Sequence, residues 1–424
     1  MNISNKTKLF FPIYFLLGWI LLTILVFIFG PYEYDIIRPV IFYFYLLGLL
    51  LSIFLGYKRG QKRSGRGSRL RINYYKFTKQ TILFSLSYFF LKVVIIGGGD
   101  FAQIFNTLRD PSLTYTTSSV RVAPTLFIYM DMFFHPFSLI AITNVIFSYK
   151  KLPKRYRYAG YFLIFISLGQ AIGAATRSGI VQNVILLTAA FTLGVYRKNI
   201  ILKYKHKVRI FVTLILFLIT FLGYSFLLTT SRDGNIIILN PITNEPPKDD
   251  YFIDQITPDE INPLTYNIAF YISHSYYNLN KAMNLSFEGL GFGLSNSYFI
   301  MDNIEAWTGW SGPKELSYGL RVEKEAGARG FGLYWSTFYT WIASDVTWPG
   351  TLIVMYFLAY SLSLALNDSL AFQNPLSVTS FCVLFYFIFH SVFNNPMQDG
   401  QGIISMFVLP MIWFNLRKKY YDIN

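Results

Sequence analysis

The side chains best suited to chemistry in this sequence are arginines that stand in short polar stretches between long apolar runs. A guanidinium presents its N–H groups as a planar fork, which can bind two oxygens of a phosphate or carboxylate at once. We expect Arg177 and Arg321 to be catalytic residues and the main ligands of a bound anion. Auxiliary substrate-binding candidates are Arg121, Arg232 and Arg329. The simpler alternative for each is contact with a lipid headgroup or a nearby acid.

Histidines and carboxylates are the candidates for moving a proton. His390 comes at the end of an apolar run, just before a polar turn, and suits a catalytic general base. His274 is its rival and a candidate substrate contact, as is Asp345, while Glu323 and Glu325 are further alternative bases. A lone histidine on an apolar face is more often a hydrogen-bonded core residue, which is the competing interpretation of both histidines.

Tryptophans offer flat faces for a sugar ring. Trp307 and Trp310 are candidates for such stacking, and Trp310 is the one that we assign to substrate binding. An aromatic belt at the membrane–water interface is the alternative. The belt is the favoured interpretation for Trp335, Trp341 and Trp348.

Sequence motifs for metal, nucleotide or serine-hydrolase chemistry are missing. The chain has no HExxH, CxxC or DxD pattern and no GxSxG elbow, and its single cysteine, Cys382, lies in an apolar run. The glycines of Gly289-Leu-Gly-Phe-Gly293 do not have the GxGxxG spacing, so they indicate a turn or a close backbone approach instead. We therefore predict neither a metal site nor a cofactor.

Long apolar runs form the scaffold that must position these residues. The chain has 424 residues, of which 53% are hydrophobic and only 14% are charged, and soluble domains carry about 25% charged residues. We predict an all-α polytopic membrane protein with about ten spans, in a range of 10–12. The predicted spans are 9–30, 38–56, 80–96, 125–148, 159–176, 180–196, 210–229, 349–366, 376–393 and 402–416.

Basic residues gather in alternate loops between the predicted spans. Of the 37 Lys and Arg, 25 lie at the two termini and in segments 57–79, 149–158 and 197–209. The positive-inside rule places these loops and both termini in the cytoplasm. Topology and anionic lipid account for this basic charge, so we expect membrane lipid as a partner and no nucleic acid.

One large loop between the spans is acidic, and we call residues 231–348 the polar segment. It holds 14 of the 22 acidic residues but only 7 of the 37 basic ones, within a chain of net charge +15. It separates a seven-span region, 1–230, from a three-span region, 349–424. Two short apolar stretches, 267–279 and 331–343, interrupt it, and each could be re-entrant or interfacial rather than spanning. We interpret 267–279 as an amphipathic helix lying on the membrane.

Together these features describe a cavity at the outer membrane boundary with arginines for a diphosphate, aromatic walls and one base. Such a site suits glycosyl transfer from a lipid diphosphate, because diphosphate leaves readily once arginines neutralise its charge. The base would remove the proton of the acceptor hydroxyl.

The layout resembles the Wzy-type polymerases of oligosaccharide repeat units, which build bacterial O-antigen and capsule. The resemblance rests on the single large outer loop, the turn Ala174-Ala-Thr-Arg-Ser-Gly179, and a loop in which ten residues separate Arg321 from Gly332. Gly332-x-Tyr334 then leads through Asp345-x-x-x-x-Gly350 into the next span. Arg232 does not repeat the ten-residue spacing, because Thr243 stands where a glycine is needed.

By this resemblance the chain would have a metal-independent, GT-C-like glycosyltransferase architecture. It would polymerise repeat units linked to undecaprenyl diphosphate, which serve as both donor and acceptor. The resemblance implies the bacterial inner membrane, with the polar segment periplasmic or extracellular, and leaves room for a chain-length regulator as a partner.

Three other functions remain open at this point. An O-antigen ligase-like transferase would share the layout and the donor but use another acceptor. A lipid-linked oligosaccharide flippase or another transporter would need charged residues along the span interiors, whereas the mid-span charges here are few, mainly Asp131. A scaffold without catalytic activity would not require arginines at the outer boundary.

Overall fold

The computed structural model is built from α-helices. It describes residues 3–63, 65–68, 72–96, 107, 125–148, 150–173, 177–200, 204–233, 247–248, 251, 262–325, 336–372 and 374–418. The helices belong to two compact units, each assembled from three stretches of the chain. Unit 1 comprises 1–63, 236–364 and 387–407, and unit 2 comprises 64–235, 365–386 and 408–424.

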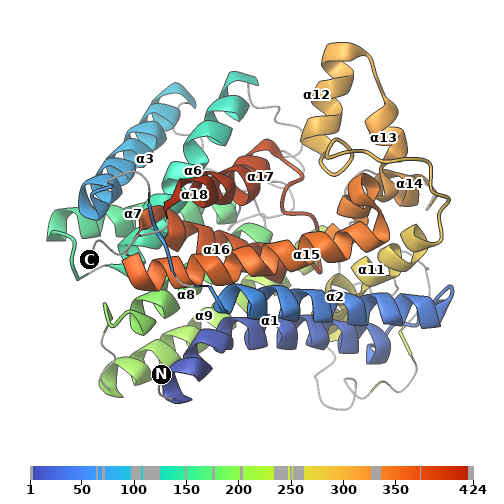
Figure 1. Cartoon of the computed structure of the whole chain (residues 1–424), viewed down its shortest axis with the longest axis horizontal. Helices are drawn as coiled ribbons and strands as arrows, with labels where there is room; N and C mark the ends of the chain where they lie inside the picture. Colours follow the sequence, from blue (N-terminus) through green and yellow to red (C-terminus); the bar gives the residue numbers. More distant parts are fainter. Residues whose placement is uncertain are drawn as a thin grey trace. The chain divides into compact units, whose positions relative to one another are not determined.

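Each predicted span falls on a helix (Figure 1). The helices are α1 (Ile3–Phe29), α2 (Pro39–Gln61), α3 (Tyr74–Ile96), α6 (Thr125–Phe147), α7 (Lys154–Gly173), α8 (Arg177–Tyr196), α9 (Tyr204–Asp233), α15 (Phe338–Phe372), α16 (Pro375–His390), and the run α17 (Gly400–Ile403), η2 (Ile404–Val408, a π-helical stretch) and α18 (Leu409–Leu416). Among the described residues, five helices are long and apolar enough to cross a membrane: α1, α2, α6, α8 and α15. A multi-pass membrane protein follows from these helices, whereas the number of ten spans and the division at residues 231 and 348 stay predictions.

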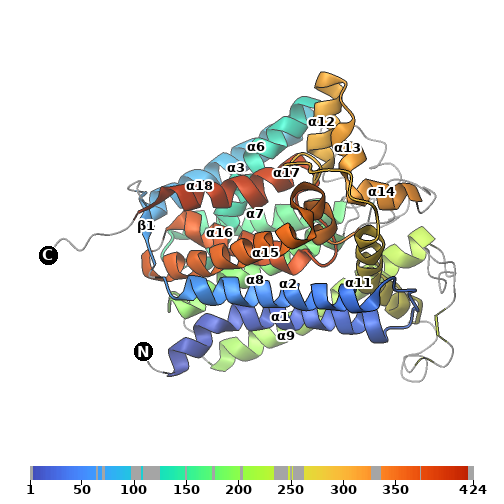
Figure 2. The same ribbon diagram turned by 45° about the vertical axis from the view of Figure 1, so that its right-hand side comes forward.

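The polar segment is also helical where the structure describes it. Its helices are α11 (Asn262–Met283), α12 (Tyr298–Thr308), α13 (Gly312–Leu316) and α14 (Tyr318–Glu325). All four belong to unit 1. Figure 2 shows α11 crossing steeply over the ends of α1 and α2, while α12 and α13 stand side by side and project away from these helices.

Unit 1 is held together by close contacts between α1, α2, α15 and the end of α16. Trp19 of α1 stacks on Phe389, with ring centroids 4.5 Å apart, and its indole N–H donates to the Phe389 carbonyl oxygen at 3.1 Å. Gly56 of α2 lies so close to the backbone of Tyr356 in α15 that a Cβ there would collide with its carbonyl. A glycine is needed where two helix backbones approach this closely.

The second half of α11 is buried within unit 1, and the expected placement of this helix on the membrane stays a prediction. Residues 273–280 are all buried, so this half has no exposed stripe. Its polar side chains bond to several neighbours: Ser273 to Tyr34 (Oγ–Oη 2.9 Å), Tyr276 to Thr23 (Oη–Oγ1 2.8 Å), and Ser275 to the carbonyl of Val392 (2.6 Å). Burial of these polar side chains is tolerated because each of them has a hydrogen-bond partner. A re-entrant placement of α11 stays a prediction.

Helix α15 consists of two helical pieces that meet at Thr347. This residue has φ 68° and ψ 171°, a backbone conformation that a β-branched residue rarely adopts. Pro349 follows two residues later and lacks the N–H that a continuous helix would use. All residues from 336 to 345 are buried, and the expected interfacial or re-entrant position of 331–343 stays a prediction.

Unit 2 contains α3, α6, α7 and α8, which share one apolar core. The core includes Ile82 of α3, Val145 of α6 and Ile166 of α7. The mid-span charge of α6, Asp131, accepts hydrogen bonds from Tyr88 (Oη–Oδ1 2.5 Å) and Lys92 (Nζ–Oδ2 3.1 Å) of α3. Pairing neutralises this charge, which lowers the cost of placing it among apolar helices.

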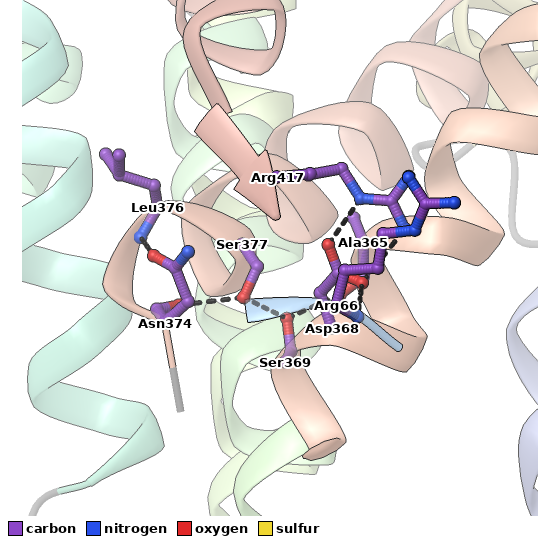
Figure 3. Close-up of polar contacts among 8 residues, drawn as sticks. All are labelled: Arg66, Ala365, Asp368, Ser369, Asn374, Leu376, Ser377 and Arg417. Carbon is purple, nitrogen blue, oxygen red and sulfur yellow. Dashed lines mark hydrogen bonds and ion pairs between the residues drawn. The ribbon is translucent and has the colours of Figure 1, made fainter. Parts of the chain in front are cut away.

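Arg417, which follows α18, binds Asp368 in the last turns of α15 (Figure 3). Arg417 donates to both oxygens of Asp368, from Nε at 2.6 Å and from Nη2 at 3.0 Å, and Asp368 also accepts the backbone N–H of Arg66 at 2.7 Å. Next to this pair, the strands β1 (Gly67–Ser68) and β2 (Arg417–Lys418) pair antiparallel. These contacts bring two of the basic stretches together, 57–79 and the C-terminus.

Candidate functional site

The short helix α14 carries two charged candidates, Arg321 and Glu323. It buries Tyr318, Gly319 and Val322 and leaves the charged side chains at its edge. Gly319 permits this packing, since a Cβ at that position would lie 2.7 Å from the indole of Trp341 in α15. The helix therefore sits directly against the first piece of α15.

Arg321 is held in a fixed orientation by the segment that precedes α12. Its Nη1 donates to the Ser286 carbonyl at 2.9 Å, and its Nη2 donates to the Ser286 hydroxyl at 3.0 Å. Nη2 also forms an ion pair with Glu288 Oε1 at 2.8 Å, and the guanidinium lies 5.5 Å from the ring centroid of Tyr318. The Arg321 side chain is 16% exposed and that of Glu288 is 48% exposed. The arginine is thus anchored, while its carboxylate partner faces water.

Glu323 lies in a drier environment on the same helix. Its Oε1 accepts a hydrogen bond from the Tyr298 hydroxyl at 2.8 Å, and the Tyr298 ring packs edge-on against Trp341. Burial raises the pKa of Glu323 above its ordinary value of 4.5, and the bond from Tyr298 lowers it in part. Burial, together with the neighbouring carboxylate, also raises the pKa of Tyr298, so this hydroxyl stays protonated and donates.

The glycine run 289–293 approaches the carboxylate of Asp345. A Cβ on Gly291 would collide with Asp345 Oδ1, and the Gly291 N–H donates to the Ser344 carbonyl at 2.8 Å. The same carboxylate accepts from the backbone N–H of Ser295 at 3.0 Å and from the Asn296 side chain. Asp345 is 2% exposed. The carboxylate therefore organises the loop, and any substrate contact would have to share its oxygens with these donors.

The turn that follows His390 bonds to the same loop. His390 is the last residue of α16, and its ring lies edge-on to Phe393, with centroids 5.9 Å apart. Further along, Asn395 donates from its side chain to the carbonyl of Asn296, and Ser297 Oγ donates to the Gln398 carbonyl at 3.0 Å. The segments 291–299 and 391–399 are thereby joined beside α14 and α15.

His274 lies inside α11. Its Nδ1 is 2.9 Å from the carbonyl oxygen of Phe270, and its ring stacks on that of Phe270 with centroids 4.6 Å apart. It is fully buried. These contacts suit the core-histidine interpretation, and its assignment to substrate binding stays a prediction.

Of the other predicted arginines, Arg177 is the one whose side chain lies within the described part of the chain. Arg177 begins α8 in unit 2 and donates from Nη2 to the Ser225 carbonyl at 3.0 Å. Arg121 and Arg329 lie outside the described residues, and Arg232 lies in α9 at a position whose side chain is not described.

The tryptophans divide into a buried and an exposed set. Trp341 is fully buried, so it has no exposed ring surface for a belt, whereas Trp348 is partly buried against Tyr318 and Tyr45 and its place in the expected belt stays a prediction. Their indoles fill the space between α14, α15 and α2. Trp307 and Trp310 are exposed, whereas Trp335 lies outside the described residues.

The described part of the site offers the anchored guanidinium of Arg321, the partly buried carboxyl group of Glu323, the buried carboxylate of Asp345 and the exposed rings of Trp307 and Trp310. No group of three or more metal-ligating side chains gathers among the described residues. Glu288, Ser286 and Tyr298, which orient Arg321 and Glu323, were missed by the sequence reasoning. No motif links them to α14, because they lie 25 to 35 residues away along the chain.

Comparisons with known proteins find no match for this chain among protein families, curated proteins or solved structures.

Proposed function

We propose that this protein is a membrane glycosyltransferase that polymerises lipid-linked oligosaccharide repeat units into a surface polysaccharide. The donor and acceptor would be repeat units on undecaprenyl diphosphate, in the inner membrane of a bacterium, and the architecture would be GT-C-like. Apolar helices able to cross a membrane, joined to a folded acidic segment with an anchored arginine, support this proposal.

The observation that carries the proposal is the geometry of Arg321. The backbone and side chain of Ser286 orient the guanidinium, while the half-exposed Glu288 is its anionic partner among the described residues. A diphosphate oxygen would take the place of the Glu288 carboxylate, which can swing into water. An arginine already oriented by other groups loses less entropy when it binds its ligand.

The reaction would be a displacement at the anomeric carbon of the donor sugar. The hydroxyl oxygen of the acceptor forms the new glycosidic bond as the bond between that carbon and the diphosphate oxygen breaks. Undecaprenyl diphosphate leaves with the electron pair, and Arg321 stabilises its added charge. The acceptor proton passes to a base, for which His390 and Glu323 are the candidates. The raised pKa of Glu323 favours it, since a base works best with a pKa near the working pH.

The test is a gel of surface glycan from cells that lack the gene, with the lipid-linked pool analysed in parallel. We expect the polymer ladder to vanish while single repeat units still reach the surface, and the intact gene to restore the ladder. Long polymer accumulating on its lipid carrier would instead identify a ligase. Single units trapped on the cytoplasmic side would identify a flippase, and an unchanged ladder would rule out all three functions.

A further inference from the structure

Two tryptophans are presented to solvent at the tip of the hairpin formed by α12 and α13. Trp307 is 73% exposed and Trp310 is 52% exposed. The two helices stand side by side and project away from α1 and α2, with the tip, residues 307–312, at their far end (Figure 1). Nothing in the glycosyl-transfer step uses this tip.

The tip is a built structure rather than a loose loop. Gly309 has φ 71°, which suits glycine, and its N–H donates to the Glu305 carbonyl at 2.8 Å to end α12. Thr308 Oγ1 donates to the Ile304 carbonyl at 2.6 Å and accepts the N–H of Trp310 at 3.2 Å.

The base of the hairpin is fixed by ion pairs and by close packing. Lys314 of α13 pairs with Asp302 at 2.7 Å and also with Glu305, both on α12. The indole of Trp310 lies against Gly312, where any Cβ would collide with it. The backbone around both indoles is therefore held in place, and the rings are displayed at the end of a braced hairpin.

Charge decides between the two surfaces that such a tip could meet. The hairpin, residues 297–317, carries Asp302, Glu305 and Glu315 against the single cation Lys314. Segments that insert into bacterial membrane surfaces are typically rich in Lys and Arg, because the lipid is anionic. An acidic hairpin is repelled by that surface, but its carboxylates can accept hydrogen bonds from hydroxyl groups.

We propose that the tip is a docking platform for a saccharide chain. The apolar C–H faces of two sugar rings would stack on Trp307 and Trp310, whose flat indoles combine an apolar face with a polar N–H. The exposed carboxylates of Asp302 and Glu305 would accept hydrogen bonds from neighbouring hydroxyls. The proposal rests on the proposed function, since the saccharide is the polymer that the enzyme would make.

Three double variants at Trp307 and Trp310 distinguish stacking of sugar rings on aromatic faces from general apolar contact. Changing both to Phe keeps flat rings, changing both to Leu keeps apolar bulk without a ring, and changing both to Ala removes both properties. Binding of the polysaccharide released from cells that carry the gene would be measured by calorimetry, with the protein in detergent micelles. We expect the Ala and Leu variants to lose about tenfold or more in affinity and the Phe variant to retain most of it.

Several outcomes would overturn the platform. They are an absence of binding by the unaltered protein, equal binding by all variants, and binding by the Leu variant as tight as that of the unaltered protein. A further test uses vesicles of brominated phospholipid, whose bromines quench nearby tryptophans. The fluorescence of Trp307 and Trp310 is obtained as the difference between the unaltered protein and the Ala variant. Quenching of this fluorescence would place the tip in the membrane and overturn the platform.

Cells expressing the variants distinguish this inference from the proposed function. We expect the Ala variant to keep a glycan ladder with a shorter modal length, because chains leave the enzyme sooner. If deletion of the gene leaves the glycan unchanged, the proposed function falls, while the binding measurement still decides the platform.

Discussion

Two charged residues on one short helix have opposite surroundings, and this difference determines what each can do. Arg321 is anchored by Ser286 and faces the half-exposed Glu288, so its charge is available at the edge of α14. Glu323 is partly buried and accepts a hydrogen bond from Tyr298, whose ring packs on Trp341. These surroundings support the proposed roles, in which Arg321 binds an anion and Glu323 is a candidate for proton transfer.

We expect Arg321→Ala to abolish chain growth and Arg321→Lys to lose most of it. Removing one preorganised donor of this kind typically costs about 10²-fold in rate or more. Lysine keeps the charge but not the planar fork that binds two oxygens. The measurement is the glycan ladder from cells expressing each variant at equal level in the membrane, and a normal ladder with Arg321→Ala would exclude the role.

Glu288→Gln is the matched control for these variants. It removes the ion pair of Arg321 but leaves the guanidinium in place. If Arg321 only stabilises the fold through that pair, Glu288→Gln and Arg321→Ala should behave alike. If Arg321 binds the donor, Glu288→Gln should keep the ladder.

Glu323 should make the stability of the protein fall with rising pH. Burial raises its pKa in the folded protein above the ordinary 4.5, so between these two values the folded state binds more protons than the unfolded state. Stability then declines across this window and is level on either side of it. Glu323→Gln cannot ionise and should remove this contribution, as seen in thermal unfolding in detergent over a pH series. An equal decline in both proteins would contradict the assignment.

At the scale of elements, irregular segments are anchored by buried carboxylates. Asp345, near the break in α15, accepts hydrogen bonds from Ser295 and Asn296, and Gly291 leaves the room for this approach. Asp368, at the other end of α15, accepts from Arg66 and Arg417. In both places a carboxylate accepts hydrogen bonds from N–H groups of a non-helical segment, which lack the carbonyl partners that a regular helix would provide.

Removing only one partner of the Asp368–Arg417 pair should lower the free energy of unfolding more than replacing both. Arg417→Ala leaves a buried carboxylate without its cation and should lower the free energy of unfolding by about 3–5 kcal/mol. Thermal unfolding in detergent, followed by tryptophan fluorescence, measures this loss.

The double variant Asp368→Asn with Arg417→Gln serves as its control. No charge is then left buried, so most of the stability should return, although the backbone N–H of Arg66 keeps only a neutral acceptor. A loss as large as the sum of the two single variants would show that the charges do not act as a pair.

At the scale of the whole molecule, the two compact units interleave along the chain. Helices α15 and α16 each contribute residues to both, since the unit boundaries fall after Leu364 and before Phe387. A truncation within either helix would therefore disturb both units. The division predicted from hydropathy, at residues 231 and 348, separates membrane spans from the polar segment. It does not describe the two compact units.

Single-cysteine labelling can test the topology of the whole chain with little background. The only native cysteine, Cys382, is buried in α16. We expect a cysteine at Asp302 to react with a membrane-impermeant maleimide in intact spheroplasts, and one at Lys62 only after permeabilisation. Reaction of both from outside, or the reverse pattern, would overturn the orientation derived from the basic loops.

Hydropathy and charge determined the membrane scaffold, because both are properties of local sequence. Each predicted span falls on a helix, and Arg321 and Glu323 were singled out from residue type and position. The glycine run was correctly taken for a close backbone approach, but not its target, Asp345.

Tertiary structure decided which partner each of these residues has. The sequence reasoning placed Trp341 at the interface and 267–279 on the membrane, yet both Trp341 and the second half of α11 are buried. Arg321 and Glu288 are 33 positions apart, and nothing in their spacing predicts an ion pair. The physical reason is that the burial of an indole or a polar helix face depends on partners contributed by distant segments, which only the packed fold brings within bonding distance.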